Sequence, residues 1–186
     1  EFHSGESEEY FVGRAREFTS LSKAIEGAVD RDRPALVRIS GPSGMGKTEL
    51  SRHFLGEVRR KYERSVVLTA VCHSEESVPY RALDGIVDSI VDWFERDETK
   101  LPEVPVEDLR NLARLFPVVG RLLPGRGEIE RRGSDERRRS VAEVHRRAVE
   151  GMDSILREMS REGPVVLFVD DIQWGDADSA QLLVEL

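Results

Sequence analysis

A glycine-rich octapeptide constrains this chain more than any other feature of its sequence. Its residues are Gly41-Pro42-Ser43-Gly44-Met45-Gly46-Lys47-Thr48. A short apolar run at 35–40 precedes it, and an amphipathic segment at 47–62 follows it. This order predicts a buried strand, a tight loop and a helix. A strand that leads through such a loop into a helix favours a sheet with helices packed on its faces.

The residue types in this loop suit a nucleotide phosphate. Glycine permits a concave backbone path whose N–H groups point inward, and the N-terminus of the following helix adds partial positive charge. Lys47 would reach the β- and γ-phosphates, and the Thr48 hydroxyl would bind Mg²⁺. Chance supplies this motif in fewer than about one chain of this length in a hundred, so a ligand-free turn is the weaker interpretation. We therefore expect Gly41 to Glu49 to contact the nucleotide.

A second motif places two carboxylates at the end of an apolar run. The segment from Pro164 to Asp170 predicts a buried strand, and Asp171 follows it directly. Ligands of open α/β sheets bind at the C-terminal ends of the strands. Asp170 is placed to hold Mg²⁺, and Asp171 is placed to orient or deprotonate an attacking water. The alternative, a strand that ends in a polar turn, is disfavoured by the complete phosphate-binding motif upstream.

The rest of the chain alternates helical and strand patterns. Apolar residues recur at helical spacing in 14–30, 79–94, 109–116 and 134–162, while 65–72 reads as another buried strand. Gly163 and Pro164 mark the end of the long helix at 134–162, and Asp176 reads as the N-cap of a last helix. The sequence therefore predicts an α/β fold with a parallel sheet, three strands and flanking helices.

Three segments together resemble one family. They are Phe11-Val12-Gly13-Arg14 before the first helix, the glycine-rich loop, and Phe168 to Asp176. This combination resembles the STAND branch of AAA-type P-loop ATPases, and more narrowly the origin-recognition-like AAA ATPase module of large bacterial signalling proteins. The segment from Cys72 to Asp84 is similar to modules fused to serine/threonine protein kinases.

The resemblance implies a P-loop NTPase sheet with ATP and Mg²⁺ as cofactors. It also implies that Val12, Gly13 and Arg14 flank the adenine, with backbone groups reading its edge. Trp174 is interpreted as a structural anchor after the acidic strand.

The resemblance also implies a domain organisation. The ATPase domain would occupy 11–186, with a helical insertion at about 97–133 and a disordered or artificial leader at 1–10. The domain is expected to be C-terminally truncated, because the family's next strand and its sensor, arginine-finger and lid residues would follow Leu186.

Composition argues against several classes of partner. The chain has 28 Lys and Arg against 36 Asp and Glu, a net charge of −8, which is a poor starting point for binding nucleic acid. No apolar run approaches the about 20 residues that a membrane span needs, and a single cysteine permits no internal disulfide. We expect a cytoplasmic protein without a membrane partner.

An arginine-rich stretch at 121–147 is the exception to this acidic balance. Its members are Arg121, Arg126, Arg131, Arg132, Arg137, Arg138, Arg139, Arg146 and Arg147. Acidic residues are interleaved with them, and no Phe, Tyr or Trp is present to stack on bases. A solvated face is therefore favoured over a nucleic-acid groove.

Three functions remain open from the sequence. The leading hypothesis is slow ATP hydrolysis that switches a larger regulator, whose partners are the other domains of the parent chain or a second copy. A nucleotide-binding assembly module with little hydrolysis is the alternative. A GTPase or small-molecule kinase is the third, but the pair Asp170–Asp171 and the Gly13–Arg14 entry favour ATP.

Overall fold

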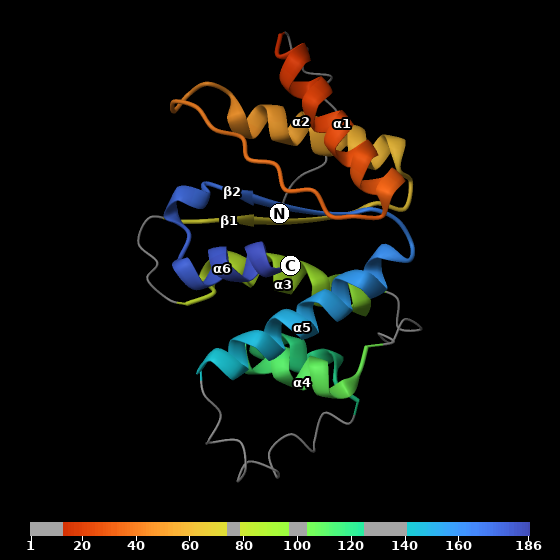
Figure 1. Cartoon of the computed structure of the whole chain (residues 1–186), viewed down its shortest axis with the longest axis vertical. Coiled ribbons are helices and arrows are strands. Elements are labelled where there is room, and N and C mark those ends of the chain that lie inside the picture. Colours follow the sequence, from red (N-terminus) through yellow and green to blue (C-terminus); the bar gives the residue numbers. More distant parts are fainter. Residues whose placement is uncertain (1–12, 74–78, 97–103, 125–140) are drawn as a thin grey trace. The chain divides into compact units, whose positions relative to one another are not determined.

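The computed structural model describes residues 13–73, 79–96, 104–124 and 141–186 (Figure 1). These residues belong to two compact units, Glu1–Glu63 and Arg64–Leu186. The expected leader at 1–10, Val12 and most of the arginine-rich stretch lie outside the described residues.

The first unit contains a pair of helices, α1 (Ala15–Arg31) and α2 (Lys47–Lys61). Both were predicted from their apolar spacing. Leu21 of α1 is buried, and Leu50, Leu55 and Val58 are the buried apolar residues of α2. The ring of Phe18 packs edge-on against Phe54, with 5.9 Å between their centroids. These contacts hold the N-terminal part of α1 against α2.

The prediction of a buried strand at 35–40 is wrong. The segment has no regular secondary structure, and Leu36 is 86% exposed. A strand needs a neighbour that satisfies its backbone N–H and C=O groups. The described residues of the first unit contribute two helices and loops but no second strand. The apolar composition was therefore insufficient to make a strand here.

The second unit is built on two parallel strands, β1 (Val66–Val71) and β2 (Val165–Asp170). Val66 pairs with Val165, and Val71 pairs with Asp170. Parallel pairing requires a crossover, and here it runs through α3 (Asp84–Glu95), α4 (Val106–Leu115) and α5 (Val141–Ser160). The last helix is α6 (Ala177–Glu185). The predicted α/β class with a parallel sheet is confirmed, although the described sheet has two strands rather than three.

The core of the second unit lies between one face of the sheet and these helices. In Figure 1, α3 and α6 lie against the sheet, and α5 and α4 lie further from it. Leu68 and Ala70 are buried in this core and alternate along β1, as a half-covered strand requires. The helical stripes that the sequence predicted in α3 and α5 supply nine of the other buried core residues. Their buried members are Ile86, Val87, Ile90, Val91, Phe94, Ala148, Met152, Ile155 and Met159.

A 3-10 helix follows α4 in the crossover. Pro117 ends the α4 segment, as predicted, and begins this 3-10 helix at Pro117–Leu122. Helix α4 and the 3-10 helix both fall within the range predicted as a helical insertion, of which 97–103 and 125–133 lie outside the described residues. Among the helices that the structure describes, none is long and apolar enough to cross a membrane.

Candidate functional site

The glycine-rich loop leads directly into α2. Gly44 and Gly46 have φ angles of +77° and +75°, a left-handed conformation that residues with a Cβ adopt only under strain. A Cβ atom built at Gly41, Gly44 or Gly46 would meet no heavy atom within 4 Å. The loop surface is therefore open. Left-handed turns next to a helix N-terminus are the backbone arrangement that gathers N–H groups around an anion.

The side chain of Lys47 folds back over this loop. Its Nζ donates hydrogen bonds to the carbonyl oxygens of Gly41 and Pro42, each at 3.1 Å. These acceptors are neutral, and hydrogen bonds from an ammonium group to phosphate oxygens are stronger. A phosphate group in the loop would therefore draw Lys47 away from the two carbonyls.

Arg14 also reaches the loop from the start of α1. Its guanidinium donates to the carbonyl oxygen of Met45, which is 31 residues away in the sequence, and forms an ion pair with Glu17 at 3.3 Å. The backbone at Gly13 and Arg14 is left-handed, with φ angles of +98° and +57°. The structure thus brings Arg14, which the family resemblance assigned to the nucleotide site, to the glycine-rich loop.

The first turn of α2 carries the remaining predicted residues of the loop. Thr48 is exposed there, and Glu49 forms an ion pair with Arg52. A hydroxyl group directly after Lys47 is suitably placed for a cation bound to the phosphates.

The two predicted carboxylates lie at the C-terminal end of β2, in the second unit. Asp170 is the last strand residue and is half-buried, and its Oδ1 accepts from the Asp171 N–H at 3.0 Å. Asp171 is exposed in a left-handed conformation (φ +52°), and its Oδ1 accepts from Nε2 of Gln173 at 2.9 Å. A carboxylate oxygen is a type of ligand that Mg²⁺ prefers, and Asp170 supplies one at this strand end.

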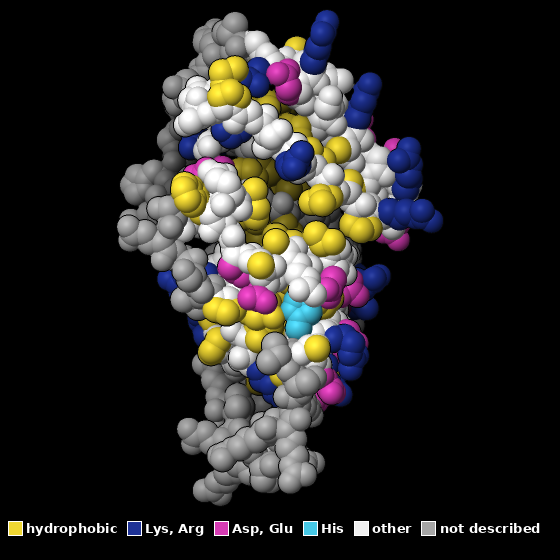
Figure 2. Space-filling model, turned by 60° about the vertical axis from the view of Figure 1, so that its left-hand side comes forward, with side chains coloured by type: hydrophobic (Ala, Val, Ile, Leu, Met, Phe, Trp, Pro, Cys, Tyr) yellow, Lys and Arg dark blue, Asp and Glu magenta, His cyan; other side chains and the backbone are white. Residues whose placement is uncertain are grey.

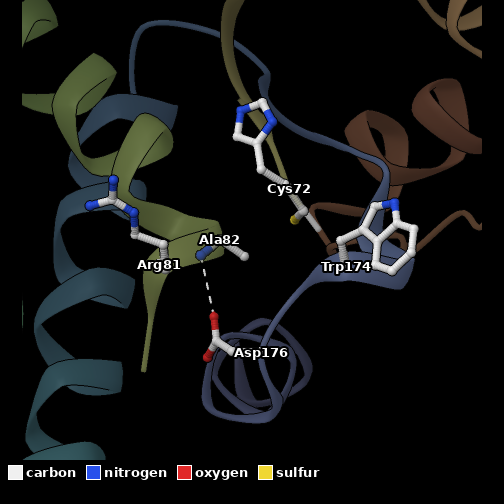
Figure 3. Close-up of a pocket in the computed structure, with 6 residues that line it drawn as sticks. Cys72, Arg81, Ala82, Trp174 and Asp176 are labelled. Atoms are coloured by element: carbon white, nitrogen blue, oxygen red, sulfur yellow. Dashed lines mark hydrogen bonds between the residues drawn. The ribbon is translucent and has the colours of Figure 1, made fainter. Parts of the chain in front are cut away.

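A small pocket lies beyond the C-terminal ends of both strands (Figure 3). Its lining residues are Cys72, His73, Arg81, Ala82, Trp174 and Asp176. Cys72 is buried, whereas Trp174 is 51% exposed. A structural anchor would have a buried side chain. The exposure of Trp174 therefore does not support this predicted role.

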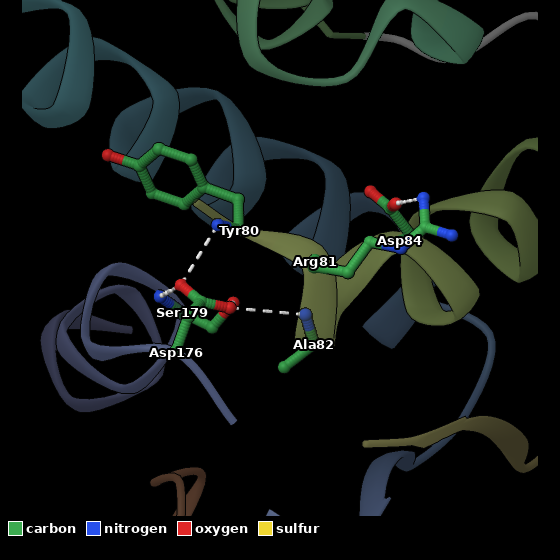
Figure 4. A network of polar contacts seen from close by, with 6 residues as sticks. All are labelled: Tyr80, Arg81, Ala82, Asp84, Asp176 and Ser179. Atoms are coloured by element: carbon green, nitrogen blue, oxygen red, sulfur yellow. Dashed lines mark hydrogen bonds and ion pairs between the residues drawn. The ribbon is translucent and has the colours of Figure 1, made fainter. Parts of the chain in front are cut away.

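Asp176 holds this end of the second unit together (Figure 4). Its Oδ1 accepts from the backbone N–H groups of Tyr80 at 2.9 Å and Ser179 at 2.8 Å. Its Oδ2 accepts from the Ser179 hydroxyl at 2.7 Å and the Ala82 N–H at 3.3 Å. Burial alone would raise the pKa of Asp176, but the hydrogen bonds from Ser179, Tyr80 and Ala82 outweigh it and lower the pKa. The sequence predicted the N-cap but missed the contacts with 80–82.

Tyr80 extends this network into the core, which the sequence also failed to indicate. Its Oη lies 2.8 Å from Nδ1 of His145, and Nε2 of His145 lies 3.2 Å from Oε2 of Glu185. Burial, together with the nearby carboxylates of Asp178, Asp176 and Glu185, raises the pKa of Tyr80. The buried His145 thus joins α5 to α6 and to the segment before α3.

Three arginines of the arginine-rich stretch are described, and each has an acidic partner. Arg121 pairs with Glu95, Arg146 with Glu150 and Arg147 with Glu143. On the face in Figure 2, dark-blue basic side chains lie beside magenta acidic ones. This interleaving supports the prediction of a solvated face for the described arginines.

Comparison with known families identifies the class of this chain. Residues 10–186 match the AAA ATPase domain family, and the chain belongs to that family. Searches among curated proteins and among solved structures found no match. Membership confirms the P-loop NTPase class that the loop indicated, and it suggests nucleotide binding and hydrolysis. Proteins of this family typically bind ATP with Mg²⁺.

Proposed function

We propose that this chain binds Mg-ATP on the loop from Gly41 to Glu49 and hydrolyses it slowly. The observation that carries the proposal is the open loop itself. Its left-handed glycines lead into the N-terminus of a fifteen-residue helix, and the Lys47 ammonium lies over its carbonyls. A positive helix end, a loop of left-handed glycines and a lysine ammonium together favour a polyphosphate over a neutral ligand.

Each predicted residue has a distinct role in this proposal. Lys47 binds the β- and γ-phosphates, while Thr48 and Asp170 hold Mg²⁺. The ion, when bound, neutralises charge on the phosphate oxygens. Asp171 orients or deprotonates the attacking water. The backbone of Val12, Gly13 and Arg14 contacts the adenine edge.

The biological setting is also a proposal. The family resemblance favours a STAND-type nucleotide switch in a cytoplasmic signalling or regulatory protein of bacteria. Its partners would be the other domains of the parent chain, or a second copy in a nucleotide-dependent assembly. The interleaved charges at Arg121, Arg146 and Arg147 argue against nucleic acid as the partner.

One observation favours the alternative, a nucleotide-binding module with little hydrolysis. The Asp171 carboxylate accepts a hydrogen bond from the Gln173 amide. This bond occupies one oxygen of the carboxylate that would otherwise contact the attacking water. A high affinity for Mg-ATP with negligible phosphate release would support this alternative.

Calorimetric titration with Mg-ATP and Mg-GTP, followed by a phosphate-release assay, tests the proposed function. We expect saturable binding of Mg-ATP, weaker binding of Mg-GTP and slow release of phosphate. Absence of Mg-ATP binding by the folded chain would contradict the proposal. Preference for Mg-GTP would contradict the assignment of adenine as the base of the bound nucleotide.

A further inference from the structure

We infer that Arg14 is a positioning residue that fixes the peptide between Met45 and Gly46 and thereby orients the Gly46 N–H for phosphate. This inference rests on the proposed function of the loop. It assigns the side chain of Arg14 a role separate from the contact with adenine proposed for its backbone.

The first step is the geometry of the contact. The Arg14 guanidinium donates to the Met45 carbonyl oxygen. In a trans peptide the C=O and N–H groups point in opposite directions. Holding the Met45 carbonyl on the side of Arg14 therefore holds the Gly46 N–H on the opposite side of the loop.

The second step is that this peptide would otherwise rotate easily. It joins Met45 to Gly46, whose φ of +75° belongs to a region that glycine leaves and enters at little cost. Gly44, on the other side of Met45, is equally permissive at φ +77°. Two such hinges around one residue leave the Met45–Gly46 peptide plane poorly fixed unless an outside group holds it.

The third step is that Arg14 is itself held. Its Nη1 pairs with Glu17, and its carbonyl oxygen accepts from the Phe18 N–H at 2.9 Å as α1 begins. Phe18 in turn packs on His53 and Phe54 of α2, with ring centroids 5.5 and 5.9 Å away. The guanidinium therefore projects from a base that is packed against the helix following the loop.

The consequence is preorganisation. A donor that already points toward the phosphate position needs no ordering when the ligand binds, and this raises affinity. Loss of the Arg14 contact should therefore weaken the binding of any polyphosphate, whether or not it carries a base. The adenine contact, by contrast, affects only ligands that contain the base.

The test uses Mg-ATP and Mg-tripolyphosphate as ligands in calorimetric titrations, with the whole chain. Arg14→Gln should lower the affinity for both ligands by about the same factor, on the order of tenfold. Glu17→Gln should produce a smaller change in the same direction, because it releases only the anchor of Arg14. Arg16→Gln is the matched control, since it removes one positive charge from an exposed position on the same turn of α1.

A second readout separates positioning from a general loss of charge. The amide resonance of Gly46, recorded without ligand, should shift in Arg14→Gln and stay unchanged in Arg16→Gln. Weaker binding of Mg-ATP with unchanged binding of Mg-tripolyphosphate would overturn the inference in favour of a base contact. Weaker binding of both ligands with an unmoved Gly46 resonance would overturn it in favour of direct charge attraction. Failure of the proposed function is distinguishable, because parental protein would then bind neither ligand.

Discussion

The backbone N–H of Tyr80 donates to Oδ1 of Asp176, 96 residues later in the chain, at 2.9 Å. This bond joins the segment that follows β1 to the segment that follows β2. Because Asp171 lies in the second of these segments, the same carboxylate that caps α6 also restrains the loop that carries the proposed catalytic carboxylate.

Removal of the Asp176 carboxylate should destabilise the second unit. Asp176→Ala deletes an N-cap and leaves the N–H groups of Tyr80 and Ala82 without their acceptor, a loss of about 2–3 kcal/mol. Urea unfolding followed by tryptophan fluorescence measures it, since Trp93 and Trp174 both belong to the second unit. Asp178→Ala, in the first turn of the same helix, is the control. Equal losses in the two variants would refute the role assigned to Asp176.

Acid should weaken the second unit partly through this same carboxylate. The pKa of Asp176 is lower in the folded chain than in the unfolded one. Its contribution is therefore fully present above the unfolded pKa of about 3.9 and is lost as the pH falls through the lower folded pKa. The free energy of unfolding should decline less steeply below about pH 4 in Asp176→Asn than in Asp178→Asn. Identical slopes would show that Asp176 contributes nothing to acid sensitivity.

A glycine inside α5 should tolerate no side chain. A Cβ at Gly151 would lie 2.7 Å from the carbonyl oxygen of Asp108 in α4, so the two helices would have to move apart. We expect Gly151→Ala to destabilise the chain by about 1–3 kcal/mol. Gly56→Ala in α2 is the control, because its Cβ meets nothing within 4 Å and alanine is the better helix former. The midpoint of thermal unfolding should be lower than the parent's in Gly151→Ala and higher in Gly56→Ala. A higher midpoint in Gly151→Ala would contradict the packing of α4 on α5.

Asp170 and Asp171, at the C-terminal end of β2, should differ in function. Asp171→Asn is expected to retain Mg-ATP binding and to lose phosphate release, because it removes the water-activating group and leaves the metal ligand. Asp170→Asn should instead weaken the dependence of ATP binding on Mg²⁺. Titrations at several Mg²⁺ concentrations, with a phosphate-release assay, distinguish the variants. Parental hydrolysis by Asp171→Asn would exclude Asp171 as the group that activates water.

Local patterns predicted most of the elements. The apolar spacing in α3 and α5 is a property of consecutive residues, and it identified Ile90, Met152 and their neighbours as core. The N-cap at Asp176 was readable for the same reason, since its Ser179 partner lies three residues away.

Features that depend on distant partners could not be read in this way. The run at 35–40 has strand composition, yet whether it forms a strand is decided by a neighbouring strand and not by its own residues. The contacts of Tyr80 with His145, of Asp176 with Ala82 and of Arg14 with Met45 each join segments far apart in sequence. No spacing rule covers such pairs, so only the folded structure shows them.

The effect of Lys47→Ala on Mg-ATP affinity tests the central claim most directly. The substitution removes the ammonium group over the loop and leaves the backbone and its glycines in place. Isothermal titration should show at least a tenfold loss of affinity, about 1.4 kcal/mol, whereas Lys61→Ala at the far end of α2 should bind like the parent. Unchanged Mg-ATP affinity in a folded Lys47→Ala variant would contradict the assignment of this loop as the phosphate-binding site.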